Sequence, residues 1–292
     1  MNRKPDWLKR KISLNSLNIN QVRNLIYSSH LNTVCQSAKC PNIFECFGKK
    51  TATFMLMGNI CTRNCGFCGI KSGKPEILDE DEPSRVANAV KEMGLKYVVI
   101  TSVTRDDLPD GGVSHFAKTV SEINRLNLEL RIECLIPDFK GNVNNLEILL
   151  AEDLDVLNHN METVKKNFSK VRKYADYETS LNILKSAKSL KPDIYTKSGF
   201  MLGLGENREE IVGLLSDLKE GDCDIVTIGQ YLRPSGSNLP VKKYYRPEEF
   251  ESIKEIAESF NFKAVASGIF VRSSYGAGII LDGILNKKNN NL

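Results

Sequence analysis

Short apolar runs recur from Thr51 onward, and longer stretches between them repeat their apolar residues every three or four positions. A short apolar run bounded by polar residues is typical of a buried strand. Six such runs predict strands at residues 53–57, 97–101, 130–136, 155–158, 194–201 and 225–231, and a seventh run at 264–270 extends the series.

The stretches between these runs predict helices, because a repeat of about 3.6 residues places apolar side chains on one helical face. Pro83 begins the first of them, where the fixed proline dihedral suits the first helical turn. The predicted helices cover residues 83–93, 144–151, 179–189, 208–219 and 248–260. This alternation predicts an α/β protein with a parallel sheet and right-handed crossovers. A partial TIM-type (β/α)6 barrel fits the number of units, and a doubly wound sheet is the alternative that periodicity does not separate from it.

The chain divides into three parts. Residues 1–50 form a polar extension that we expect to be irregular, residues 51–260 form the barrel, and residues 261–292 form a C-terminal extension. We expect the two extensions to cover the open mouth of the barrel. The final K-K-N-N-N-L is of low complexity, which predicts a disordered tail. The N-terminal M-N-R-K-P-D-W-L-K-R-K-I lacks the apolar segment of a secretory signal.

Composition limits the class of protein. The chain has 292 residues, of which 41% are hydrophobic, so a substantial core is possible. There is no run of about 18 apolar residues, so we expect no membrane span. The net charge of +4 gives no case for binding nucleic acid and is compatible with docking an acidic protein. The eight cysteines are clustered rather than spread as in a disulfide framework, which favours a reducing compartment, the cytoplasm.

Two cysteine triplets lie close together in the first quarter of the chain. The first is C-x4-C-x5-C and the second is C-x3-C-x2-C, directly after the first predicted strand: Cys35, Cys40 and Cys46, then Cys61, Cys65 and Cys68. Three thiolates on a 4Fe–4S cube leave one iron open to another ligand. Structural zinc, the alternative, usually takes four ligands in paired C-x2-C knuckles, and only one such pair is present. The triplets therefore indicate iron–sulfur clusters. Gly66 is expected to let the backbone turn beside the second triplet, and Phe67 to shield the cluster or support a ligand.

C-x3-C-x2-C after a first barrel strand resembles the radical S-adenosylmethionine superfamily. The resemblance implies that the open iron binds S-adenosylmethionine and that its reductive cleavage gives a deoxyadenosyl radical. The segment G-F-M-L-G-L-G-E is similar to the superfamily's G-x-I-x-G-x-x-E, which implies cofactor contacts from Gly199, Met201, Gly203 and Glu206. The stretch T-S-V-T that ends at Thr104 lies where the superfamily binds the cofactor's amino group, although it lacks the common glycine-glycine-glutamate.

The first triplet lies in T-V-C-Q-S-A-K-C-P-N-I-F-E-C-F, which resembles the auxiliary-cluster segment of the lipoyl synthase family. Further blocks similar to that family are K-P-D-W-L-K, T-R-D-D-L-P-D-G-G, L-I-P-D-F, N-H-N-M-E-T, Q-Y-L-R-P-S and R-S-S-Y. They extend from residue 4 to residue 275, so the resemblance covers nearly the whole chain.

This resemblance implies a radical sulfurtransferase that inserts two sulfur atoms at C6 and C8 of an octanoyl-lysine on a carrier protein. It implies two 4Fe–4S clusters. The second triplet would hold the cluster that cleaves S-adenosylmethionine, and the first triplet with Ser274 would hold an auxiliary cluster that is consumed as the sulfur donor. The implied partners are the octanoylated lipoyl domains of 2-oxoacid dehydrogenases, the glycine-cleavage H protein, a ferredoxin or flavodoxin reductant, and iron–sulfur cluster carriers.

Other polar residues have more than one interpretation. Glu133 stands among apolar neighbours, which fits a cofactor contact or a structural salt bridge. His159 fits a hydrogen-bond network rather than a general base. The acidic loop at residues 106–110 receives no proton-transfer role, and Cys134 and Cys223 are expected to pack as small hydrophobes.

Two rival functions remain open from the sequence. One is another radical enzyme that inserts sulfur, similar to biotin synthase or a methylthiotransferase. The other is a non-catalytic iron–sulfur or zinc module.

Overall fold

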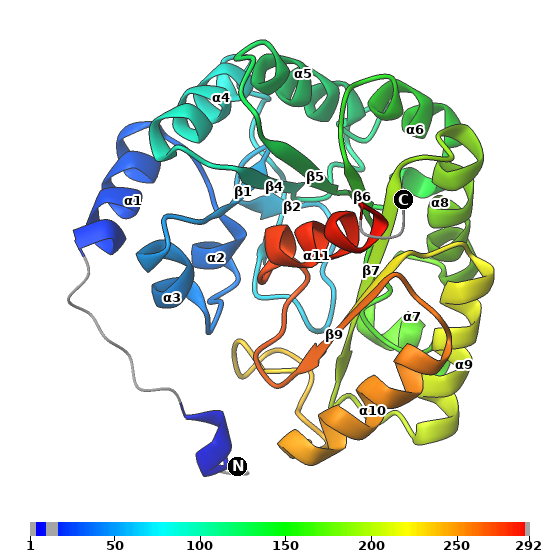
Figure 1. Cartoon of the computed structure of the whole chain (residues 1–292). Helices are drawn as coiled ribbons and strands as arrows, with labels where there is room; N and C mark the ends of the chain where they lie inside the picture. The colour runs from blue at the N-terminus through cyan, green and yellow to red at the C-terminus, as the bar shows by residue number, and fades with distance from the viewer. Residues whose placement is uncertain (1–3, 10–16, 290–292) are drawn as a thin grey trace.

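The computed structural model describes residues 4–9 and 17–289 (Figure 1). Its centre is a seven-stranded sheet in which every neighbouring pair is parallel. The strands are β1 (Thr53–Leu56), β4 (Tyr97–Ser102), β5 (Arg131–Leu135), β6 (Val156–Asn158), β7 (Tyr195–Leu202), β8 (Ile225–Gln230) and β9 (Ala264–Gly268). All seven predicted strands are therefore confirmed, with small shifts at their ends.

The order of the strands decides between the two predicted architectures. It is β1-β4-β5-β6-β7-β8-β9, so each strand pairs with the next large-sheet strand in the sequence. In a doubly wound sheet the order of the strands reverses at a switch point, and the order seen here contains no such reversal. The sheet curves inside a ring of helices as an incomplete TIM-type barrel whose ends are β1 and β9 (Figure 1).

The helices that follow the strands form the outer ring in Figure 1. The amphipathic pattern located five of them, and it missed α5, whose apolar residues also return every three or four positions. Local signals explain where they begin and end: Asn207 and Glu210 form a capping box, and left-handed Gly94 ends α4. The ring consists of α4 (Glu82–Met93), α5 (Val113–Asn124), α6 (Val143–Leu150), α8 (Tyr177–Leu190), α9 (Arg208–Glu220) and α10 (Pro247–Ser259).

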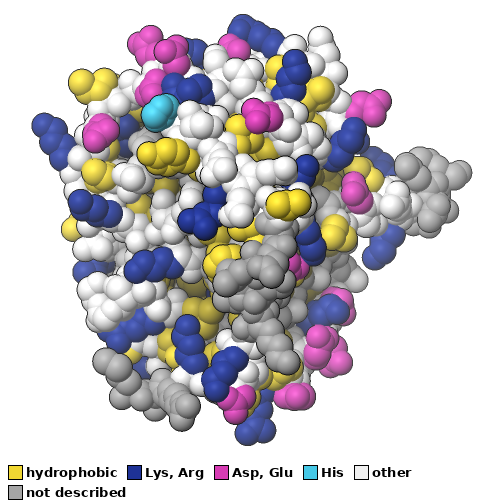
Figure 2. All heavy atoms as spheres, turned by 90° about the vertical axis from the view of Figure 1, so that its left-hand side faces the viewer, with side chains coloured by type: hydrophobic (Ala, Val, Ile, Leu, Met, Phe, Trp, Pro, Cys, Tyr) yellow, Lys and Arg dark blue, Asp and Glu magenta, His cyan; other side chains and the backbone are white. Residues whose placement is uncertain are grey.

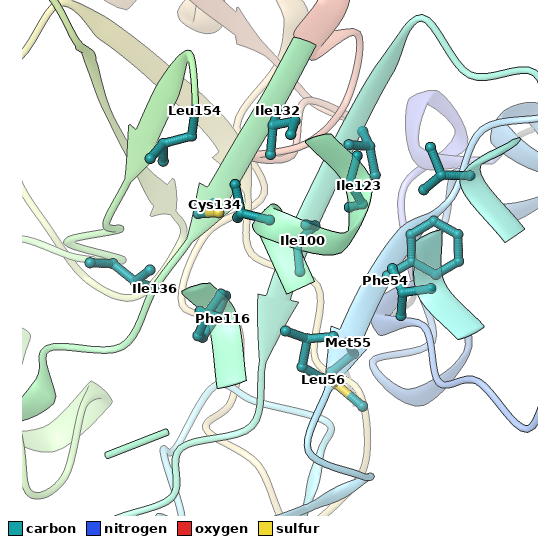
Figure 3. Packing of buried hydrophobic residues seen from close by; sticks show 14 of the residues in the cluster. Phe54, Met55, Leu56, Ile100, Phe116, Ile123, Ile132, Cys134, Ile136 and Leu154 are labelled. Carbon is teal, nitrogen blue, oxygen red and sulfur yellow. The ribbon is translucent and has the colours of Figure 1, made fainter. Parts of the chain in front are cut away.

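The main core lies between the strands and this ring. Figure 3 shows side chains of β1, β4 and β5 packing with α5, among them Phe54, Ile100, Cys134, Phe116 and Ile123. Each large apolar side chain that is fully buried contributes about 1.5–3 kcal/mol relative to exposure. Cys134 is 0% exposed and Cys223 is 2% exposed, so their expected packing role is confirmed.

The N-terminal extension is helical, which corrects the expectation of an irregular segment. It contains η1 (Asp6–Leu8), α1 (Leu17–Ser28), α2 (Val34–Ser37) and α3 (Ile43–Gly48). Ile19, Val22 and Ile26 are buried on one face of α1, at spacings of three and four. Stability here comes from tertiary packing against the barrel rather than from helix propensity, which is why a polar composition was misleading.

The C-terminal extension contributes β9 to the sheet, and its last described element is α11 (Ala277–Asn289), which crosses the barrel in Figure 1 and was not predicted. Gly278 lies so close to Tyr97, the first residue of β4, that an added Cβ would be 3.1 Å from that side chain. The predicted disordered tail is wrong for Lys287, Lys288 and Asn289, which belong to α11, and its last residues, 290–292, lie outside the described residues. No helix in the described part of the chain has the length and apolar character needed to span a membrane.

The two extensions meet each other. Thr33 forms an antiparallel bridge with Phe54 of β1, so the N-terminal extension lies against one end of the sheet. The amide Nδ2 of Asn42 donates to the Phe270 carbonyl at 2.7 Å, and the Tyr275 hydroxyl donates to Glu45 at 2.9 Å. These contacts join the segment before β1 to the segment after β9.

Candidate active site

One large cavity brings the two cysteine triplets together. Its volume is about 1080 Å³, at the upper end of the range for ligand sites. Residues from both extensions, from the loop after β1 and from the ends of several strands line it. Among them are all seven predicted cluster ligands: Cys35, Cys40, Cys46, Cys61, Cys65, Cys68 and Ser274.

The second triplet lies on a loop that is anchored from two sides. Cys61 belongs to β2 (Ile60–Cys61), which pairs with β3 (Lys71–Ser72) in a small separate sheet. Between them, the Gly66 amide donates to the Val171 carbonyl, and the Leu239 amide donates to the Gly66 carbonyl, both at 2.9 Å. The loop is therefore held between α7 (Phe168–Val171) and the segment that follows β8.

Gly66 is required for a different reason from the one predicted. Its φ is outside the left-handed region, so it does not supply a special turn. An added Cβ would instead lie 2.9 Å from Leu239 Cδ1 and 3.1 Å from the Lys170 carbonyl oxygen. Close packing, rather than backbone freedom, excludes a side chain here.

Backbone amides point at the sulfur atoms of the second triplet. Arg63 and Thr104 donate to Cys61 Sγ at 3.4 and 3.3 Å, and Ile70 donates to Cys68 Sγ at 3.5 Å. Such donors favour thiolate and tune a bound cluster. Thr104, predicted to contact the cofactor, lines the cavity and also helps to fix a cysteine.

Burial favours the protonated form of four cysteines, two from each triplet, in the absence of a metal. It raises the pKa of Cys35 and Cys68 to about 12, and the pKa of Cys46 and Cys65 to about 11. A thiolate must therefore be stabilised by a metal cation, and metal binding at these positions would release protons.

Arg63 connects the loop of the second triplet to the ends of two strands. This loop, residues 61–70, is called the cluster loop from here on. The Arg63 guanidinium is 5% exposed and donates to both oxygens of Asp106 at 2.7 and 2.9 Å. It also donates to both oxygens of Asp138 at 2.6 and 2.8 Å. The two carboxylates follow β4 and β5, so one buried cation fixes three segments around the cavity.

The first triplet is presented by the helices of the N-terminal extension. Cys35 lies in α2, which begins with the Thr33 side chain accepting from the Gln36 amide. Cys46 lies in α3, and the Cys40 amide between the helices donates to the Cys35 carbonyl at 3.0 Å. This arrangement lets three thiols spread along one wall of the cavity.

The two serines of R-S-S-Y have different surroundings. Ser273 Oγ accepts from Asn158 Nδ2 at 2.7 Å and donates to Asn160 Oδ1 at 2.9 Å. Both serines line the cavity and are half-buried. What distinguishes them is that the Ser273 hydroxyl is engaged by two asparagine side chains.

The cofactor residues proposed from G-F-M-L-G-L-G-E separate into two groups. Gly199 and Met201 line the cavity, as does Phe67 of the cluster loop. Gly203 and Glu206 are not among its lining residues. The Glu206 carboxylate accepts from the amides of Gly203 and Leu204 at 2.5 and 2.9 Å, so this pair builds the turn after β7.

Glu133 forms the structural salt bridge that its buried position allowed. It is fully buried, and its carboxylate accepts from Lys197 Nζ at 2.9 and 3.0 Å. Tyr97 and Asn158 donate to the same carboxylate at 2.6 and 2.7 Å. Glu133 is not among the cavity-lining residues, and its contact with a cofactor stays a prediction.

Four polar residues of the cavity were not selected from the sequence, although N-H-N-M-E-T marked the position of three of them: His159, Asn160, Glu162 and Arg172. Arg172 Nη1 donates to the Asn160 carbonyl at 2.6 Å and lies 3.3 Å from His159 Nε2. Burial, followed by the charge of Arg172, lowers the pKa of His159 to about 3, so the imidazole is neutral at neutral pH. This confirms a network role for His159.

The donor set is chemically suited to iron–sulfur clusters, because six of the side chains that line the cavity are cysteine thiols. Ligands of a cube bind different irons, so they surround a volume. The cavity offers such volumes beside two sets of three thiols. Ser102 Oγ, which also lines it, is buried without a hydrogen-bond partner in the described structure, as expected of a group reserved for a ligand.

The barrel and the cysteine loop define a class of protein, and sequence comparison confirms it. Residues 55–218 match the model of the Radical SAM superfamily. Among solved structures, methylornithine synthase aligns with a TM-score of 0.51 at 17% identity, over 88% of this chain and 84% of that chain. HydG, a maturase of the [FeFe]-hydrogenase, aligns with a TM-score of 0.58 at 16% identity, over 73% of this chain and 50% of that chain. At these identities the likeness is one of fold.

Curated relatives are much closer in sequence. The lipoyl synthase of Caldanaerobacter subterraneus subsp. tengcongensis is 53% identical over 95% of this chain and 96% of the relative. That of Glaesserella parasuis serovar 5 is 49% identical over 98% of this chain and 89% of the relative. The chain belongs to the lipoyl synthase family. It is thus a sulfurtransferase of the radical S-adenosylmethionine type, and the family implies S-adenosylmethionine and a 4Fe–4S cluster as its cofactors.

Proposed function

We propose that this enzyme inserts two sulfur atoms, at C6 and C8, into an octanoyl chain carried on a lysine of a partner protein, and that it holds two 4Fe–4S clusters to do so. The observation that carries the proposal is the shared cavity, which six cysteines and Ser274 line together. In functional terms we divide the chain into an extension with auxiliary ligands at 1–50, the barrel at 51–260, and an extension with the serine ligand at 261–292.

The second triplet, Cys61, Cys65 and Cys68, would hold the cluster that cleaves S-adenosylmethionine, called the first cluster from here on. Three thiolates leave one of its irons free for S-adenosylmethionine. The same cavity is lined by Gly199, Met201 and Phe67. The lack of a side chain at Gly199 and the apolar side chains of Met201 and Phe67 would allow a nucleoside to approach. Thr104 and the unpartnered Ser102 offer polar contacts on the neighbouring strand end. Gly203, Glu206 and Glu133 do not line the cavity, and we retain them as residues that support the walls of the cofactor site.

The first triplet would hold the auxiliary cluster, called the second cluster from here on, with Ser274 as the fourth ligand beside Cys35, Cys40 and Cys46. Ser273 is engaged by two asparagines, which favours Ser274 as the fourth ligand. When bound, the two groups would supply a one-electron cleavage of the sulfonium bond and a store of sulfide for the substrate.

The protein itself positions the acyl chain and excludes water. C6 and C8 are unactivated carbons, so a general base could not remove their protons, and burial, which lowers the pKa of His159 to about 3, makes its imidazole a weak base. Both ligand sets are fixed in one chain around one cavity, which gives the reacting groups a high effective concentration. Apolar lining such as Met55 and Val99 suits an alkyl chain.

The substrates would be octanoylated lipoyl domains of 2-oxoacid dehydrogenases and the glycine-cleavage H protein. A ferredoxin or flavodoxin would supply electrons, and iron–sulfur carriers would rebuild the second cluster. We place the enzyme in the cytoplasm, where thiols stay reduced.

Two cysteine variants test the division of labour. With an octanoylated peptide, Cys61→Ala is expected to abolish formation of 5′-deoxyadenosine. Cys40→Ala is expected to keep 5′-deoxyadenosine formation and to lose sulfur insertion. Cys223→Ala, in the packed core, controls for loss of a thiol and should keep both activities. Lipoylated peptide from Cys40→Ala would contradict the donor assignment. Two bound zinc ions and no cofactor cleavage in the wild type would favour the non-catalytic module.

A further inference from the structure

A second cavity lies against the loop of the second triplet. Its volume is about 590 Å³. Cys65, Cys68, Gly69 and Ile70 line both this cavity and the large one. The loop that contains Cys65 and Cys68 is therefore shared by the large cavity and this second cavity.

The charge of the second cavity has one sign. Three lysines line it, Lys71, Lys170 and Lys173, and all three are exposed. The other lining residues are asparagine, serine, glycine, cysteine, isoleucine and leucine, with no aspartate or glutamate among them. The face of the molecule in Figure 2 carries both Lys or Arg and Asp or Glu side chains.

The loop shared by the two cavities is firmly held. Asn238 Nδ2 donates to the Cys68 carbonyl at 2.8 Å, and the Leu239 amide donates to the Gly66 carbonyl at 2.9 Å. On the other side, the Gly66 amide donates to the Val171 carbonyl, next to Lys170. A partner that docks on the lysines would thus contact a rigid loop whose cysteines bind the first cluster.

We propose that this lysine-lined cavity is the docking site of an acidic one-electron carrier protein, which reduces the first cluster through the loop that contains Cys65 and Cys68. The inference rests on the proposed function, because that function requires an electron for each cleavage of S-adenosylmethionine. One electron leaves the reduced carrier and enters the cluster, and no atom is transferred. Complementary charge would steer the encounter and make it sensitive to salt.

The position of the site has a functional consequence. The octanoyl chain would enter the large cavity, and the electron carrier would dock at the second cavity, where the three lysines lie. The two partners do not compete for one surface, so the enzyme can be reduced a second time while the half-reacted substrate stays bound.

The test uses the reconstituted full-length enzyme and a reduced flavodoxin as the probe. The variant Lys170→Glu/Lys173→Glu reverses two charges of the site. Its affinity for flavodoxin, measured by the change in flavin fluorescence, is expected to fall at least about tenfold, and 5′-deoxyadenosine formation driven by flavodoxin should fall with it. Turnover driven by dithionite, which needs no protein docking, should be unchanged.

Lys91→Glu/Lys185→Glu is the matched control, with the same change of charge on exposed residues of α4 and α8 outside either cavity. It should bind flavodoxin almost as the wild type does. Unchanged affinity of the Lys170/Lys173 variant, or an equal loss in the control, would overturn the docking site. Should the variant fail to fold, Lys170→Gln/Lys173→Gln carries the same test with a smaller expected loss. No cofactor cleavage by the wild type with dithionite would instead contradict the proposed function.

Discussion

Single residues hold the cluster loop in place through contacts that differ in kind. Arg63 acts by charge, because it places one buried guanidinium between Asp106 and Asp138. Gly66 acts by its lack of a side chain, because two neighbouring segments approach it closely. Both residues lie between cysteines of the second triplet, so a substitution at either position would displace the cysteines themselves.

Arg63→Gln is expected to destabilise the protein strongly, because it leaves the 2% exposed carboxylate of Asp138 without its cation. Removing one partner of a buried ion pair costs about 3–5 kcal/mol. Urea unfolding of the anaerobic enzyme measures this loss. Arg85→Gln, which breaks a more exposed pair with Asp79, should cost less than about 1 kcal/mol. Equal losses in the two variants would contradict the role of Arg63.

The same pair predicts a pH dependence. Burial alone would raise the pKa of Asp138, but the hydrogen bonds and charge of Arg63 hold it below its usual range. A lowered pKa in the folded state stabilises the protein above the unfolded pKa, which is about 3.9 for aspartate. The stability difference between wild type and Arg63→Gln should therefore be complete at neutral pH and shrink below about pH 4. A difference that is constant down to pH 3 would contradict this account.

Gly66→Ala is expected to lower stability by about 1–3 kcal/mol and to reduce the iron held by the second triplet, because its methyl group overpacks against Leu239 and Lys170. Gly213→Ala is the control. Gly213 lies in α9 with nothing within 4 Å of an added Cβ, so alanine should stabilise the helix by up to about 1 kcal/mol. Iron analysis and urea unfolding check both, and an unaffected iron content in Gly66→Ala would contradict the packing argument.

The sequence pointed to candidate cluster ligands more readily than to the residues that hold their loops in place. Cysteines at fixed spacing carry their chemistry in the residue type, so Cys61 and Cys35 could be assigned before the fold was known. Arg63 and Arg172 could not, because their partners lie in loops that follow other strands and no spacing reveals the pairing. Glu133 could be recognised as buried, but only the fold placed Lys197 beside it.

At the scale of elements, the two extensions work as one unit. The segment before β1 supplies three thiols and the segment after β9 supplies Ser274, although they are far apart in the sequence. Asn42, which is 1% exposed, donates across this junction to Phe270. The second cluster should therefore depend on the junction, whereas the first cluster depends on the barrel.

Asn42→Ala is expected to remove this hydrogen bond at a cost of about 1–3 kcal/mol and to weaken the second site selectively. With a chelator under anaerobic conditions, about four of about eight irons should leave faster than in the wild type, and the rest should leave at the normal rate. Asn144→Ala, an exposed position in α6, is the control and should match the wild type. Uniform loss of all irons would contradict separate support of the two sites.

Periodicity predicted the barrel elements because each strand is a buried run and each outer helix has one apolar face. It missed α5, whose apolar face was visible at residues 113–123, and the sequence of the first 50 residues concealed α1 among polar residues. The short β2 and β3 have two residues each, too few for any period, and only the cluster loop that they close explains them.

For the whole molecule, the fold places two cavities against one cysteine loop, and residues of both extensions line the larger of them. A closed barrel would have no side for the extensions to cover. The sheet has two ends, β1 and β9, and the segments bearing the second ligand set lie there. The incomplete barrel is what allows both sets of candidate ligands to line one cavity.

The most direct test of the central claim follows the sulfur. The apoenzyme is reconstituted anaerobically with iron and heavy-isotope sulfide, freed of excess sulfide, and given one turnover on an octanoylated peptide. If the second set of ligands holds a cluster that supplies the sulfur, the lipoylated peptide will carry heavy sulfur at both positions and the protein will lose iron. Lipoylated peptide with sulfur of natural mass would contradict the account.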